Sequence, residues 1–323
     1  MQEMIQTVME QWLALIPGAL PQSPQSPQYP GGAAVPDRHA GRPAFVAGSY
    51  QSGDGELRYK LFIPGSYAGE QMPLLVMLHG WGQTADDFAD GTGMNDLAEK
   101  HGWLVLYPER SAFGYGGCWN WFDRAHQQRG SGDPALIAAT TRAVMASHAV
   151  APGRVFIAGM SAGGAMAVVM GRTYPDLFAA VGCHSGLPHA CATDSASALH
   201  VMRHGAVSPG GATAQAGPAV PVIVFHGDDD ATVNLANGAS VVRESLAAAG
   251  LARPPVRLEA SATGFGRSFT RAVHRKADGI VVAEHWVIHG AGHAWSGGNG
   301  RGSFTDPQGP PASAEMLRFF LQV

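Results

Sequence analysis

Residues 154–167, Arg-Val-Phe-Ile-Ala-Gly-Met-Ser-Ala-Gly-Gly-Ala-Met-Ala, place one serine between an apolar run and a segment of small residues. The run that ends at Gly159 predicts a buried strand, and Ala162–Arg172 predicts a helix. Ser161 therefore lies in a G-x-S-x-G pentapeptide at a strand–turn–helix junction, the setting of a nucleophile elbow. The pentapeptide alone is weakly specific in a chain with 43 glycines, and the context makes Ser161 a candidate nucleophile.

The sequence on either side of this junction alternates strand-like apolar runs with helical patterns. Alternation of this kind predicts an α/β protein with a mostly parallel central sheet and helices on both faces. Together with the predicted nucleophile elbow, it makes the α/β-hydrolase fold the expected type. Ligands of such sheets bind beyond the carboxyl ends of the strands. We expect strands at 57–63, 73–79, 103–107, 154–159, 178–183, 220–226 and 281–288, and helices at 86–100, 134–148, 162–172, 195–204, 235–249 and 316–321.

A serine hydroxyl needs a base within hydrogen-bond reach to act as a nucleophile. In this fold the base follows the last strand, and His293 lies in the glycine-rich loop after the run 281–288. His289, at the end of that run, is expected to be structural. The acid that orients the base should follow the run 220–226, where the aspartates 228–230 are adjacent. Spacing alone leaves these three carboxylates as alternatives.

The remaining part of the machinery is a pair of backbone donors for the oxyanion. The predicted strand 73–79 leads into His79-Gly80-Trp81-Gly82, and the other donor is expected directly after the nucleophile. The N–H groups of Trp81 and Ala162 are therefore the predicted oxyanion hole.

Three tryptophans lie in the loops that follow these strands. Trp119, Trp121 and Trp295 are interpreted as substrate-binding residues of an apolar cleft, with core packing as the alternative. No ligand cluster accompanies the adjacent aspartates, so we expect neither a metal site nor a cofactor.

Composition bounds the remaining possibilities. The 323 residues, 46% of them hydrophobic, suffice for one large core, and a formal net charge of -4 offers no basic surface for nucleic acid. No apolar stretch is long enough for a transmembrane helix. The amino terminus has Glu3 and Glu10 and no early cation, so a cytoplasmic protein is expected, or a secreted one if the amino terminus was trimmed.

Three cysteines are too few for a disulfide scaffold. Free thiols are favoured, although Cys183 and Cys191 flank a loop that would allow a bridge.

Residues 1–44 differ in composition from the predicted catalytic domain at 45–323. Residues 2–16 have apolar side chains at helical spacing, and residues 17–44 form a Pro/Gln/Ser-rich linker. The helix could pack on its own domain, form an oligomer contact, or dock on an apolar surface such as a polymer granule.

The motifs together resemble the poly(3-hydroxybutyrate) depolymerase family of esterases over roughly residues 57–300. The likeness is carried by LHGWGQTADDFADGTGMNDLAEKHGWLVLYPE, CWNWF, RVFIAGMSAGGAMA, YPDLFAAVGCHSGL, VFHGDDDATV and GAGHAWSGG. The family pattern H-G-x-x-D-x-x-V implies Asp230 as the acid, beside Ser161 and His293 as nucleophile and base. Many relatives have a cysteine at the position of Trp81 that is able to bridge to one at the position of Cys118, so that bridge cannot form here.

The expected function is hydrolysis of short-chain carboxylic esters, including poly- or oligo(3-hydroxybutyrate)-type polyesters, through an acyl-enzyme. A feruloyl or acetylxylan esterase, or an acyltransferase, would use the same machinery on another substrate. A non-catalytic granule-binding or partner-binding protein is the alternative from a different class.

Overall fold

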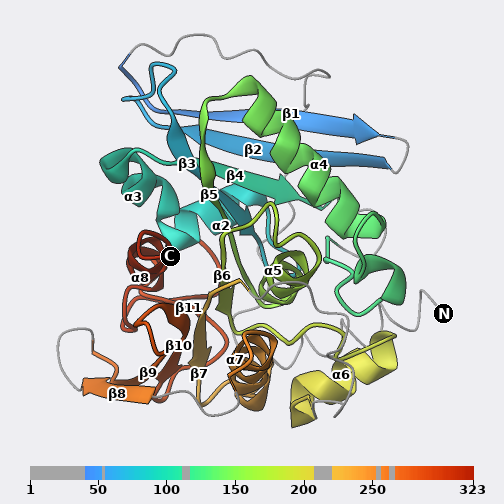
Figure 1. The fold of residues 1–323 in the computed structure, drawn as a ribbon, viewed down its shortest axis with the longest axis vertical. Helices are drawn as coiled ribbons and strands as arrows, with labels where there is room; N and C mark the ends of the chain where they lie inside the picture. Colours follow the sequence, from blue (N-terminus) through green and yellow to red (C-terminus); the bar gives the residue numbers. More distant parts are fainter. Residues whose placement is uncertain (1–40, 53–54, 111–116, 207–219, 252–255, 262–265) are drawn as a thin grey trace.

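The computed structural model describes residues 41–52, 55–110, 117–206, 220–251, 256–261 and 266–323. It contains one ten-stranded sheet flanked by helices and a small two-stranded sheet (Figure 1). The strands are β1 Ala44–Ser52, β2 Gly55–Ile63, β3 Met72–Leu78, β4 Leu104–Glu109, β5 Val150–Met160, β6 Ala180–His184, β7 Val222–Gly227, β8 Val256–Ser261, β9 Phe269–Arg275, β10 Val281–Ile288, β11 Trp295–Ser296 and β12 Thr305–Asp306. The helices are α2 Ala85–Thr92, α3 Met94–His101, η1 Arg124–His126, α4 Gly132–Ser147, α5 Ala162–Thr173, α6 Ser195–His204, α7 Ala236–Ala248 and α8 Ala312–Phe320.

The centre of the large sheet is parallel. Its strand order is β1-β2-β4-β3-β5-β6-β7-β10-β9-β8, and the strands from β4 to β10 all run in the same direction. Leu78, Gly159, Cys183 and Val224 share one row of this register, so the carboxyl ends of four strands meet at one edge. The predicted α/β class with a mostly parallel sheet is confirmed.

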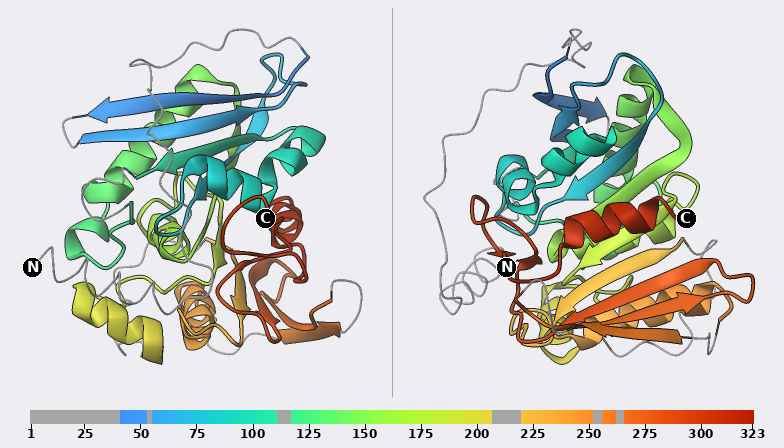
Figure 2. Two further views of the ribbon diagram at one scale, coloured as in Figure 1. Left: turned by 180° about the vertical axis from the view of Figure 1, so that it is seen from behind. Right: turned by 90° about the vertical axis from the view of Figure 1, so that its left-hand side faces the viewer.

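Helices cover both faces of the sheet because the buried central strands are apolar on both sides. Helices α4, α5, α6 and α7 enclose one core, which includes Ile157, Met166 and Val224, and α2, α3 and α8 enclose the other, which includes Phe156, Phe225 and Phe319. Figure 2 shows the sheet lying between these two layers of helices.

The helices and strands differ from the sequence prediction in several places. The single helix expected at 86–100 is two helices, α2 and α3, because the chain turns at Gly93 with a φ of 61°. Strands β1, β8 and β9 of the large sheet, and the short strands β11 and β12, were not predicted. β1, β8 and β9 pair antiparallel toward the two ends of the strand order, and β1 and β9 are only partly buried, so no continuous apolar run is required of them.

The predicted amino-terminal helix at 2–16 and most of the linker at 17–44 lie outside the described residues, so the division at residue 44 stays a prediction. The first described strand, β1, begins at Ala44. Within the described ranges, no helix has the length and apolar character needed to cross a membrane. Cys118, Cys183 and Cys191 are free thiols, as favoured from the sequence.

Candidate active site

Ser161 lies on the turn between β5 and α5. Its backbone has φ 55° and ψ -119°, a conformation that is costly for any residue with a Cβ. The turn is compact because α5 begins at once and passes the end of β3. A Cβ added to Gly163 would overlap the carbonyl oxygens of Leu78 and His79. The strained turn therefore holds Ser161 at the carboxyl edge of the sheet and at the amino terminus of a helix.

Asp230 and His293 form a buried pair at the same edge. Asp230 follows β7, His293 follows β10, and Oδ2 of Asp230 accepts a hydrogen bond from Nδ1 of His293 at 2.8 Å. The Asp230 side chain is fully enclosed and that of His293 is 11% exposed. Because a carboxylate only accepts, Nδ1 carries the proton and Nε2 is left as the basic nitrogen.

The turn after β7 is built to present this carboxylate. Oδ1 of Asp230 accepts the N–H groups of Thr232 and Val233 at 2.9 and 2.8 Å, and Nε2 of His226 donates to the carbonyl of Val233 at 2.7 Å. Burial alone would raise the pKa of Asp230. The charge of His293 and hydrogen bonds from His226 and His293 outweigh burial and hold that pKa well below its usual range. Asp230 is therefore ionised at neutral pH.

The adjacent aspartates have other partners. Asp228 accepts hydrogen bonds from Nδ1 of His289 and from the N–H of Gly290, both at 2.7 Å, and Nε2 of His289 lies 2.9 Å from Oγ1 of Thr270. This second Asp–His pair is solvent-exposed, with side chains 35% and 42% accessible. The Asp229 side chain is exposed. The geometry thus separates three carboxylates that spacing alone left equivalent.

His184, which sequence reasoning did not single out, connects the serine turn to the histidine loop. Its carbonyl accepts the N–H of Ser161 at 2.9 Å, and its Nε2 accepts the N–H of Ser296 at 3.0 Å. The ring stacks on Trp295 and Phe225 at centroid distances of 5.0 and 5.9 Å. Burial and the nearby histidines lower its pKa to about 3, so the imidazole is neutral and can accept. His184 lies within the family-like stretch YPDLFAAVGCHSGL and at the end of β6, and these two signals could have found it.

The predicted oxyanion donors flank the nucleophile. Ala162 is the first residue of α5, and the first N–H groups of a helix have no partner within it. Trp81 follows β3 on a turn that passes close to Ser161, since a Cβ added to the neighbouring Gly80 would lie 3.7 Å from the Cβ of Ser161. The Trp81 side chain is partly buried against the core, and Cys118 is a buried thiol whose pKa burial raises to about 12.

The three predicted substrate-binding tryptophans lie in the core. Trp119 is fully buried and its indole N–H donates to the carbonyl of His79 at 3.0 Å, whereas Trp295 is 1% exposed and donates to Oγ of Ser313 at 3.0 Å. Trp121 is 5% exposed. Enclosed rings offer no face to a substrate, so the interpretation as substrate-contacting residues is corrected to one of structural support for the site.

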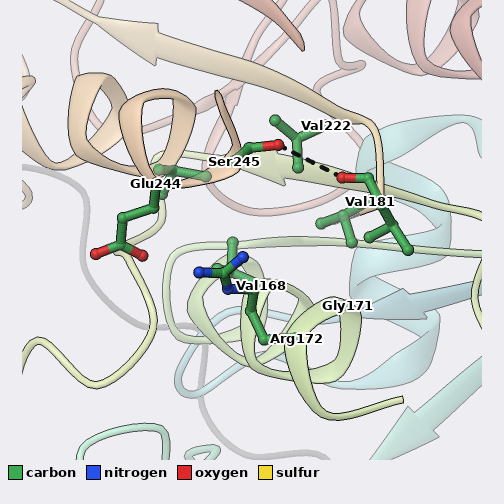
Figure 3. Close-up of a pocket in the computed structure, with 9 residues that line it drawn as sticks. Val168, Gly171, Arg172, Val181, Val222, Glu244 and Ser245 are labelled. Carbon is green, nitrogen blue, oxygen red and sulfur yellow. Dashed lines mark hydrogen bonds between the residues drawn. The ribbon is translucent and has the colours of Figure 1, made fainter. Parts of the chain in front are cut away.

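One described pocket lies away from Ser161, between the sheet and helices α5 and α7 (Figure 3). Its apolar lining consists of valines from α5, β6, β7, the residues just before β7, and α7, and Arg172 of α5 and Glu244 of α7 supply its charges. Arg172 is at the far end of α5 from Ser161, roughly 16 Å away at 1.5 Å per residue. Burial raises the pKa of Glu244 to about 7, although Arg172 opposes this. Among the residues that the structure describes, no cluster of three or more His, Cys, Asp or Glu is arranged to hold a metal.

The chain is similar to esterases in sequence and in fold. The family model described as esterase PHB depolymerase matches residues 57–258. A poly(3-hydroxyalkanoate) depolymerase C of Paucimonas lemoignei is 33% identical over 231 residues, which are 68% of this chain and 54% of the relative. Feruloyl esterase B of Neurospora crassa is 32% identical over 151 residues, 46% of this chain and 51% of the relative.

The chain spans about half the length of these curated relatives. Among solved structures, an acetyl xylan esterase from Aspergillus awamori superposes with a TM-score of 0.67 at 20% identity, over 86% of this chain and 100% of that one. This likeness supports the fold, and the family match covers the strands from β2 to β7 together with Ser161 and Asp230. The chain belongs to the esterase PHB depolymerase family.

Proposed function

We propose that this protein is a serine esterase that hydrolyses short-chain carboxylic esters, with polyesters of the 3-hydroxybutyrate type as its substrate class. The observation that carries the proposal is the Asp230–His293 pair, whose hydrogen bond leaves Nε2 of His293 as the basic nitrogen, at the edge of the sheet where the strained serine turn also lies. The family match and the relative described as a poly(3-hydroxyalkanoate) depolymerase supply the substrate class.

The proposed reaction has two steps. Oγ of Ser161 attacks the ester carbonyl while Nε2 of His293 takes its proton, and the N–H groups of Trp81 and Ala162 stabilise the oxyanion. His293 then protonates the leaving alcohol and activates water to hydrolyse the acyl-enzyme. Asp230 stays ionised throughout and stabilises the imidazolium, as its lowered pKa favours.

A second candidate is an esterase for aromatic or sugar esters on plant polymers. It is favoured by relatives named feruloyl esterase B and acetylxylan esterase, which match 46% and 41% of this chain at 32% and 33% identity. The catalytic groups would be the same, so only the acyl and alcohol parts of the substrate separate the two candidates. An acyltransferase would pass the acyl group to an added alcohol rather than to water.

The test is a panel of p-nitrophenyl esters from acetate to dodecanoate, with soluble 3-hydroxybutyrate oligomers and methyl ferulate. Ser161→Ala is expected to lower kcat by about 10⁴-fold or more while substrate binding persists. Ser147→Ala, at the end of α4, is the matched control and should match wild type. Preference for ferulate would favour the second candidate. Near wild-type turnover by Ser161→Ala would exclude the serine mechanism, and no hydrolysis at all would favour a non-catalytic binding role.

A further inference from the structure

The turn that carries Trp81 is closed by one buried side chain. Oε1 of Gln83 accepts the N–H of Gly80 at 2.9 Å, and the backbone N–H of Gln83 donates to the carbonyl of Gly80 at 3.3 Å. Gln83 is 6% exposed. Trp81 therefore lies between two residues whose backbones are tied together, on the turn that borders Ser161.

Two further residues fix which way the amide of Gln83 points. Its Nε2 donates to Oδ2 of Asp87 at 2.8 Å and lies 3.2 Å from Oγ of Ser303. Ser303 in turn donates its N–H to Oδ1 of Asp87 at 2.8 Å and its hydroxyl to Oδ2 at 2.5 Å. Because the carboxylate of Asp87 can only accept, the amide must turn Nε2 toward it, which leaves Oε1 for Gly80. We call Gln83, Asp87 and Ser303 the oxyanion clamp.

The clamp also reaches the loop that carries His293. The residue after Ser303 is Phe304, whose carbonyl accepts the N–H of Trp295 at 2.6 Å. Phe304 has a φ of 52°, a strained value for a bulky side chain, so surrounding contacts must hold this segment in place. One segment therefore supports both the turn of Trp81 and the strand two residues beyond His293.

We propose that Gln83 is a positioning residue for the oxyanion hole and that Asp87 and Ser303 set its orientation. By holding the turn from Gly80 to Gln83, it aims the N–H of Trp81 at the oxygen that becomes negative when Ser161 attacks. The inference rests on the proposed esterase function. Since the carbonyl oxygen gains its charge only in the transition state, loss of the clamp lowers kcat much more than it changes KM.

A charge exchange within the clamp tests the proposal. Gln83→Glu places a second carboxylate against Asp87 and removes the donor, so the pair repels and the turn loosens. Asp87→Asn lets the amide of Gln83 turn over and costs Gly80 its acceptor. The double variant restores one donor, one acceptor and a single negative charge, with the polarity reversed. Ser303→Ala removes only the hydroxyl that donates to Asp87 and serves as the milder variant.

Each variant is assayed for kcat and KM with p-nitrophenyl butyrate, for thermal midpoint, and for affinity toward a short-chain trifluoromethyl ketone. That ketone would accept Ser161 and form a tetrahedral oxyanion. Each single replacement at Gln83 or Asp87 should lower kcat roughly 10–100-fold, less than the ~10²–10³-fold loss typical of deleting a whole oxyanion donor. Affinity for the ketone should fall in proportion, KM should stay within a few-fold, and the double variant should recover most of kcat.

Gln71→Glu, on an exposed residue just before β3, is the control for adding a carboxylate and should match wild type. The proposal is overturned if Gln83→Glu and Asp87→Asn both keep wild-type kcat. It is also overturned if their kcat per folded molecule is unchanged while only the thermal midpoint falls, or if a well-folded double variant recovers nothing. A wild type that hydrolyses no ester would instead overturn the proposed function, and the Ser161→Ala result separates the two failures.

Discussion

Asp228 and Asp230 each hold a histidine through Nδ1, and their surroundings differ more than their hydrogen bonds do. The Asp230–His293 pair is enclosed, and the carboxylate also accepts two backbone N–H groups. The Asp228–His289 pair is exposed to water and screened by it, which leaves little electrostatic coupling. An imidazolium that forms in the enclosed pair is therefore stabilised much more strongly.

This contrast predicts unequal effects of the same replacement at the two positions. Asp230→Asn should lower kcat by about 10³–10⁴-fold, because the amide can donate to Nδ1 and favours the wrong tautomer of His293. Asp228→Asn keeps an acceptor for Gly290 and should change kcat less than about threefold, in line with the small worth of an exposed pair. Turnover of p-nitrophenyl butyrate by both variants decides. Equal losses, or a larger loss at Asp228, would mean that Asp230 is not the catalytic acid.

At this scale the sequence indicates candidate catalytic residues more readily than the directions of their side chains, and the triad itself stays a prediction. The order of Ser161, Asp230 and His293 follows from motifs and from the positions of the strands. Three adjacent aspartates could not be told apart by spacing, because a turn decides which carboxylate points inward. The same limit applies to Trp119, whose burial depends on how the loop after β4 folds over His79.

Helix α5 and strand β3 meet so closely that the serine turn allows no side chain at one position. A Cβ at Gly163 would overlap the carbonyl oxygens of Leu78 and His79, whereas one at Gly300 would have nothing within 4 Å. The contact involves backbone atoms on both sides, so neither side can yield by rotating a side chain. The strand–turn–helix unit is thus constrained by packing of the helix against the sheet.

Gly163→Ala should therefore destabilise the fold by about 3 kcal/mol or more, in the range of severe overpacking. Activity should fall with it, because the same shift moves the N–H of Ala162 and Ser161 itself. Gly300→Ala is the matched control and should leave both the thermal midpoint and kcat unchanged. Thermal unfolding of the purified variants measures the difference, and a Gly163→Ala protein as stable as wild type would contradict the close approach of α5 to β3.

Several elements were predicted nearly to their ends, β10 because its burial leaves an almost continuous apolar run and α6 because Asp194 marks its amino terminus. α6 was predicted at its observed bounds and β10 likewise. The antiparallel strands β9 and β8, which end the strand order, were also missed; β9 is only partly buried, and a partly exposed strand has a weaker apolar pattern. The break at Gly93 was missed because apolar residues on both sides continue at helical spacing.

Two glutamates on opposite sides of the sheet, Glu284 fully buried and Glu244 partly buried, show how the whole molecule responds to pH. Glu284 of β10 is fully buried and bonded to Arg271 and Arg318 at 2.8 and 2.6 Å. Burial would raise its pKa, but hydrogen bonds and charge from the two arginines lower it. Glu244 of α7 has no comparably close pair among the described residues, so burial dominates and its pKa rises to about 7.

The two groups contribute stability in opposite pH windows. A depressed pKa means that the contribution of Glu284 is present above the ordinary value of 4.5 and is lost as pH falls through the folded value. A raised pKa means that the native state binds the proton of Glu244 more tightly than the unfolded chain does. That contribution is present below 4.5 and is lost as pH rises toward about 7.

Replacing each glutamate by glutamine should therefore change the pH profile of stability in opposite directions. Glu244→Gln should match wild type near pH 4 and exceed it at pH 8 by about 1–2 kcal/mol, after discounting for partial exposure. Glu284→Gln should lower the free energy of unfolding by about 2–3 kcal/mol at pH 7. The loss is smaller than for an ion pair with both partners buried, because Arg271 and Arg318 are partly exposed and keep Glu259 and Glu315 as second partners. That deficit should shrink as the pH falls. Urea unfolding of both variants between pH 4 and 8 measures this; profiles parallel to wild type would mean that neither carboxyl is linked to folding.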